Sequence, residues 1–219
     1  MIKDRDLKAQ QIVETILRDV KDAELFDAYK LGCYKRLLAA RFKAPNVRSF
    51  LSDESSMRLI YETLDAWDMN KRRAKMKPFE SFRDSILCCM SDLVQLEKVG
   101  QSPREVPRFL RSVYDHLHVM DSKAKLVSNA KFLHFLFPNL LMPADREHTL
   151  NYLYGVQTYA PPSRYLEIID FQWYVQSLSQ DLHRSLDHRW NTTIPKMVDN
   201  AIIILRRKQK RHTGRADFS

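Results

Sequence analysis

The sequence has 219 residues, of which 44% are hydrophobic and 29% charged, an ordinary balance for a globular protein with a sizeable core. Its 36 lysines and arginines exceed its 27 aspartates and glutamates, and the net charge of +9 is typical of proteins that bind polyanions, most often nucleic acid. The 3 cysteines form no CxxC pair, the N-terminal segment lacks a signal-peptide pattern, and no run approaches the ~18 apolar residues of a membrane span. These features argue against disulfide-rich, secreted and membrane-spanning proteins, so we expect a soluble protein in the bacterial cytoplasm or otherwise inside a cell.

Helical spacing of apolar residues dominates the first half of the chain, and the presence of only 4 glycines also favours helices over strands and tight turns. The pattern predicts helices over residues 12–20, 26–38 and 52–67. A long helix is predicted to begin near Pro78 and to stop at Gly100, with Cys88 and Cys89 in the core.

The second half continues the helical pattern and offers several cap-type residues. Ser102 and Glu105 have capping-box spacing, although Pro107 leaves the start of that helix open, and Ser122 is expected to cap a helix that runs through residues 131–137. Further helices are predicted over 145–154, ended by Gly155, and over 164–178 and 194–205.

The predicted fold class is therefore all-α, a single globular multi-helix domain. We assign residues 1–205 to this domain, with two lobes of about 1–100 and 101–205 as the alternative. A basic tail, residues 206–219, follows the last apolar positions.

Common catalytic motifs are missing from the sequence. It contains no GxxxxGK[ST], GxGxxG, HExxH or GxSxG motif. The histidine pairs His116 with His118 and His183 with His188 lack further ligands at convincing spacing, so neither a metal site nor a cofactor is predicted.

The stretch KFLHFLFPNLLMPADREHT, residues 131–149, runs from an apolar helix through Pro138 and Pro143 to Asp145. One interpretation of Asp145 is a helix N-cap, because Asp is a favoured capping residue. The other is a catalytic carboxylate, since an acid at a helix N-terminus is fixed in position and biased toward its ionised form. The two roles are compatible.

Residues 126–149, LVSNAKFLHFLFPNLLMPADREHT, resemble the core segment of the helix-hairpin-helix DNA glycosylases, the superfamily of endonuclease III and 8-oxoguanine glycosylase. In that family a hairpin turn precedes a mostly apolar helix that opens with Lys, and a short connection delivers an essential Asp to the next helix. Lys131 and Asp145 match these two residues, and residues 127–129 match the hairpin. The hairpin glycines and the iron–sulfur cysteines are missing and the Lys-to-Asp interval is shorter, so the resemblance is to a divergent member.

The resemblance implies two helical lobes with a groove between them and an enzyme that flips a damaged or modified base from duplex DNA and cleaves its N-glycosidic bond, in repair or in defence against phage. Asp145 would stabilise the developing sugar cation or activate water, and Lys131 would act as a lyase amine, unless it is an ordinary lysine facing solvent or phosphate. The base pocket would contain His134, Tyr152 and Trp173, for which packing in the core is the other interpretation. The chain would act as a monomer. The residues expected to contact DNA are Lys71, Arg72, Arg73, Lys125, Ser128, Asn129, Arg146, Arg206, Arg207 and Lys208.

Two further function classes fit the same residues. A non-catalytic helical protein that binds DNA or RNA would explain the charge and would leave Asp145 as a cap only. A helical protein that binds another protein would make the basic charge incidental.

Overall fold

The computed structural model describes the chain over residues 2–21, 27–71, 74–100, 102, 104–155, 162–187 and 189–216. Within these residues the regular secondary structure is helical, and the one extended pairing is an antiparallel bridge between Met76 and Met120. The prediction of an all-α fold is therefore confirmed.

The chain forms two compact units, and each is built from segments that are distant in sequence. Unit 1 contains Met1–Leu25, Met142–Tyr159 and Glu167–Ser219, whereas unit 2 contains Phe26–Leu141 and Ala160–Leu166. The units do not follow the expected lobe boundary near residue 100, because the N-terminal helix folds with the C-terminal part of the chain.

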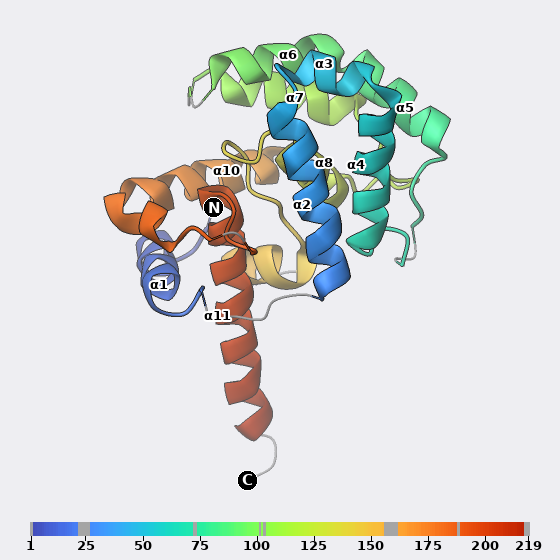
Figure 1. Ribbon diagram of the computed structural model, residues 1–219. Helices are drawn as coiled ribbons and strands as arrows, with labels where there is room; N and C mark the ends of the chain where they lie inside the picture. The colour runs from blue at the N-terminus through green and yellow to red at the C-terminus, as the bar shows by residue number, and fades with distance from the viewer. Residues whose placement is uncertain are drawn as a thin grey trace. The chain divides into compact units, whose positions relative to one another are not determined.

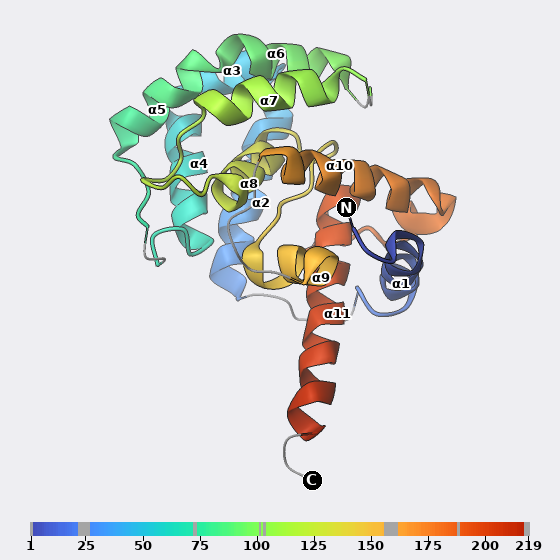
Figure 2. The ribbon, with the colours of Figure 1, turned by 180° about the vertical axis from the view of Figure 1, so that it is seen from behind.

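Unit 1 is organised around its longest helix, α11 (Ile194–Ala216), which lies beside α1 (Arg5–Arg18) in both views (Figure 1, Figure 2). Ala9, Ile12 and Ile16 are buried on one face of α1, and each fully buried isoleucine contributes about 1.5–3 kcal/mol. The residues expected to form a basic tail continue α11 as helix up to Ala216. The other helices of unit 1 are η1 (Arg146–Leu150), α9 (Asn151–Tyr154), η2 (Gln180–Ser185) and most of α10 (Pro162–Ser177).

Unit 2 surrounds the apolar helix α8 (Leu126–Leu136), which is buried along its whole length. Helices α2 (Ala28–Lys43) and α4 (Glu54–Ala66) lie side by side and both contact α8 (Figure 1). Aromatic rings fill the space between them, with the Trp67 and Phe135 ring centroids 4.9 Å apart. The remaining helices are α3 (Val47–Ser52), α5 (Phe79–Cys88), α6 (Met90–Val99) and α7 (Val106–His116).

Two expected helix boundaries are wrong, and one that the sequence left open begins later than its capping-box pattern indicated. The long helix expected from Pro78 to Gly100 is broken at Cys89, whose backbone N–H donates to the carbonyl of Ile86 at 3.0 Å, and this break leaves Cys88 exposed rather than in the core. Helix α7 begins at Val106, so Ser102 and Glu105 form no capping box. Ser122 does not cap α8, since its hydroxyl accepts from the Ala124 backbone N–H within the preceding loop.

Candidate functional site

Asp145 lies at the start of a wide helical turn in unit 1. The segment before it, residues 141–144, is buried, and Asp145 itself has extended backbone angles and caps η1. The first backbone hydrogen bond of that turn runs from the Leu150 N–H to the carbonyl of Asp145, five residues earlier, at 3.0 Å. This is the spacing of a π-helix, which is often found at functional sites. The expected N-cap role of Asp145 is confirmed.

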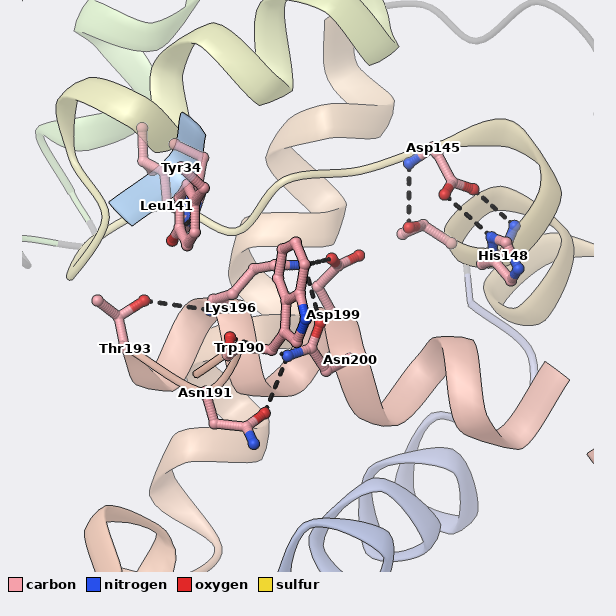
Figure 3. A network of polar contacts seen from close by, with 12 residues as sticks. Tyr34, Leu141, Asp145, His148, Trp190, Asn191, Thr193, Lys196, Asp199 and Asn200 are labelled. Atoms are coloured by element: carbon pink, nitrogen blue, oxygen red, sulfur yellow. Dashed lines mark hydrogen bonds and ion pairs between the residues drawn. The ribbon is translucent and has the colours of Figure 1, made fainter. Parts of the chain in front are cut away.

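Contacts with His148 and Thr149 hold Asp145 in place (Figure 3). The backbone N–H of His148 donates to Asp145 Oδ1 at 2.6 Å, and His148 Nδ1 lies 3.0 Å from Asp145 Oδ2. The Asp145 backbone N–H donates to the hydroxyl of Thr149 at 3.1 Å. With 24% of its side chain exposed, the carboxylate is fixed in orientation and still reaches solvent.

The imidazole of His148 responds to this carboxylate. Burial lowers the pKa of His148, but the hydrogen bond and the charge of Asp145 outweigh it, so the pKa is raised above its ordinary value. Nδ1 must carry a proton in order to donate to Asp145, and a raised pKa favours a proton on Nε2 as well. The contact with Asp145 therefore favours the imidazolium form of His148.

A buried polar network in the first half of α11 belongs to the same unit (Figure 3). The Lys196 ammonium, with 1% of its side chain exposed, donates to Asp199 Oδ2 at 2.6 Å and to Asn200 Oδ1 at 2.8 Å. Asn200 Nδ2 donates to Asn191 Oδ1 at 2.9 Å and to the Trp190 carbonyl at 3.0 Å. The network anchors the start of α11 to the loop that precedes it.

Asp199 links this network electrostatically to the candidate acid. Burial raises the pKa of the Asp199 carboxyl and Lys196 opposes the rise, while the charge of Asp145 adds to it and that of His148 reduces it. The sequence interpretation treated α11 only as an apolar helix. The sequence signal for the network is the spacing of Lys196, Asp199 and Asn200. Their positions, three and four residues apart, put three polar groups on one face of the helix.

Lys131 lies in unit 2, in the middle of α8 and not at its start. Its Nζ donates to the Trp67 carbonyl at 2.9 Å and lies 5.6 Å from the centroid of the Trp67 ring. Only 9% of the residue is exposed, so the interpretation as a helix-start lysine facing solvent is wrong.

The expected hairpin is not formed. Residues 127–129 lie within the first turn of α8, and all three are buried. The Ser128 hydroxyl donates to the Lys125 carbonyl at 3.0 Å, and Asn129 Nδ2 lies 3.4 Å from the Leu117 carbonyl. Ser128 and Asn129 are therefore internal helix residues, and the prediction that they contact DNA is wrong.

The three residues expected to line a base pocket occupy different environments. His134 is fully buried in unit 2, with Nε2 2.7 Å from the Tyr34 hydroxyl and Nδ1 2.7 Å from the Leu141 carbonyl, so it is a core histidine and not a pocket residue. Tyr152 is buried in unit 1, where burial raises its pKa and its hydroxyl donates to Gln11 at 3.1 Å. Trp173 is half-buried in α10.

The basic residues expected to contact DNA are mostly at the surface. Arg146 and Arg207 are exposed, and Arg206 is half-buried. Lys71 pairs with Asp68 at 2.7 Å, and Lys208 pairs with Asp19 at 2.6 Å. Arg72 and Arg73 lie outside the described residues.

Lys125 precedes α8 and is half-buried; burial lowers its pKa.

Among the described residues no three His, Cys, Asp or Glu side chains gather closely enough to hold a metal ion. No helix in the same part of the chain is both long and apolar enough to cross a membrane.

The sequence matches no protein-family model. Searches of curated proteins and of solved structures also give no match.

Proposed function

We propose that the protein acts on DNA as a glycosylase-like enzyme, with Asp145 as its catalytic carboxylate. The observation that carries the proposal is the orientation of this acid: both oxygens are fixed by His148, and part of the side chain remains exposed. A carboxylate that is already oriented needs no rearrangement as positive charge develops on a reacting group.

In this proposal the target base leaves the duplex stack before its N-glycosidic bond breaks. Bond breakage builds oxocarbenium character on the deoxyribose, and the Asp145 carboxylate stabilises that charge or accepts a proton from the attacking water. His148 keeps the carboxylate in one orientation through Nδ1. In the proposal the exposed cation of Arg146, the next residue, would contact a phosphate of the same strand.

The proposal assigns hydrolysis and not lyase chemistry. A lyase amine must reach the sugar and lose its proton, whereas Lys131 Nζ is buried and donates to the Trp67 carbonyl. Base release should therefore leave an intact strand until alkali is added.

A second candidate, a non-catalytic DNA- or RNA-binding protein, is favoured by the C-terminal half of α11. Arg207, Lys208, Lys210 and Arg211 are exposed along this helix. Such groups give salt-dependent affinity that is largely independent of base sequence. In this case Asp145 would serve as a cap only.

Base release separates the two candidates. The protein would be incubated with duplexes carrying uracil, oxidised, alkylated, hydroxymethylated or glucosylated bases, and abasic sites would be detected after alkali. Asp145→Asn should lose base release but keep its fold and DNA binding, because Asn also caps helices.

Asp53→Asn is the matched control, since Asp53 is another capping acid, at the start of α4, and accepts from Ser55 and Ser56. Binding without base release on every duplex would instead support the non-catalytic protein.

A further inference from the structure

Two segments of unit 2 that are distant in sequence lie side by side through the Met76–Met120 bridge. The Lys77 backbone N–H donates to the Val119 carbonyl at 3.0 Å, and the Asp121 N–H donates to the Lys75 carbonyl at 2.8 Å. Both methionines of the bridge are buried, so the pairing is anchored in the core. It brings the end of the basic stretch at residues 70–77 next to residues 116–125.

Four basic side chains lie near this pairing, Lys77, His116, His118 and Lys125, here called the bridge cluster. Lys125 Nζ lies 3.4 Å from His118 Nε2 and also donates to the Asp115 carbonyl at 2.7 Å. His116 and His118 are exposed, while Lys77 and Lys125 are partly exposed. The four groups come from α7, from the loop before α8 and from the segment before α5.

The charges that act on His118 are all positive. Burial lowers the pKa of His118, and the charges of Lys125, Lys77 and His116 lower it further. Helix α5 contributes Ser85, whose hydroxyl accepts from the His118 backbone N–H at 3.3 Å.

Carboxylates act at the edges of the cluster. Asp121 pairs with Lys77 at 2.8 Å, and the charge of Asp115 acts on Lys125. The positive charges of the bridge cluster still repel one another, so a bound anion would stabilise the folded protein.

We propose that the bridge cluster is a binding site for the phosphate backbone of nucleic acid, and that binding is coupled to proton uptake by His118. The inference rests on the proposed function for its choice of polyanion. Nucleic acid is favoured because the chain has a net charge of +9, which is typical of proteins that bind polyanions. A phosphate beside His118 would reverse the local field and favour the imidazolium, so affinity should rise as the pH falls.

The test is binding of fluorescent duplex DNA by fluorescence anisotropy, with salt varied between about 50 and 200 mM. The Lys77→Gln/Lys125→Gln variant should lower the slope of log Kd against log salt by about 0.9 for each phosphate that it no longer neutralises. Lys35→Gln/Lys43→Gln is the matched control, because it removes the same charge from exposed positions of α2 and should leave the slope close to that of the parent protein.

Proton coupling is tested with His118→Gln, which replaces an exposed side chain and should fold normally. The parent protein should bind more tightly as the pH falls from about 8 to about 6, and the variant should lose most of that gain. Circular dichroism of each variant would verify the fold.

The outcomes separate this inference from the proposed function. Cluster variants that bind DNA with the parent slope and pH dependence would overturn the inference alone. Cluster variants that weaken binding to anionic lipid vesicles but not to DNA would also overturn it. Failure of the parent protein to bind DNA would overturn both proposals. If the cluster variants alter DNA binding as expected but the parent protein releases no base, only the glycosylase proposal is overturned.

Discussion

His148 is the residue at which the structure makes the clearest pH prediction. Its pKa in the folded protein is raised above the unfolded value of about 6.5, so the folded state binds more protons near neutral pH. The stabilising contribution is fully present below about pH 6.5 and is lost as the pH rises through the folded pKa. We expect His148→Gln to reduce the free energy of unfolding more at acidic than at alkaline pH.

Urea unfolding at about pH 5.5 and pH 8.5 measures this difference, since the two values lie on either side of the histidine range. At each pH the free energy of unfolding of the variant is subtracted from that of the parent. This difference removes the contribution of His118, whose lowered pKa changes stability with the opposite sign. His183→Gln, at an exposed histidine of η2, is the control. Equal losses for His148→Gln at both pH values would contradict the charged-pair assignment.

The buried pair of Lys196 and Asp199 gives a second prediction at the residue scale. Their side chains are 1% and 7% exposed, so removing one partner leaves an uncompensated charge in the core. Lys196→Met should lower the free energy of unfolding by about 3–5 kcal/mol, and adding Asp199→Leu should restore much of the loss. A double variant no more stable than Lys196→Met, measured by urea unfolding, would show that the wider network, and not the ion pair, holds α11.

At the scale of single elements, the end of α9 depends on one glycine. Gly155 has φ 69° and ψ 14°, in the left-handed region, and its N–H donates to the Asn151 carbonyl at 2.8 Å. A Cβ at this position would meet no atom within 4 Å, so strain in the backbone is the only cost of a side chain. Gly155→Ala should lower the free energy of unfolding by about 1 kcal/mol, and Gly155→Asn by less.

Thermal or urea unfolding of the two Gly155 variants measures the difference. If both variants lost stability equally, the left-handed conformation would not be the cause. The stop at Gly155 was predictable from sequence, because glycine is the residue that commonly ends a helix in this conformation.

Other element boundaries were not predictable for physical reasons. Apolar spacing continues without interruption across Cys89, and only the packing of α5 and α6 shows that the helix breaks there. Residues 127–129 resembled a hairpin in sequence, but their side chains found partners inside unit 2 and the helix extended through them. The local pattern favoured a continuous helix in the first case and a turn in the second, and tertiary packing produced the opposite outcome in each.

At the scale of the whole molecule, the all-helical class followed from periodicity and the low glycine count. Which segments make up the two units did not follow, because α1 packs against α11 from the opposite end of the sequence and no local pattern encodes that contact. For the candidate site, the cap role of Asp145 was predicted, whereas the buried Lys196 network required the fold. The spacing of Lys196, Asp199 and Asn200 puts them on one face of α11, but only the fold shows that this face is buried.

The measurement that tests the central claim most directly is the single-turnover rate of base release on the best duplex substrate. Asp145→Asn should reduce this rate by about 10²-fold or more, and Asp53→Asn should leave it unchanged. DNA binding should be the same in both variants, so the loss would belong to chemistry and not to affinity. Base release at the parent rate by Asp145→Asn, or none by the parent protein on any duplex, would contradict Asp145 as the catalytic carboxylate.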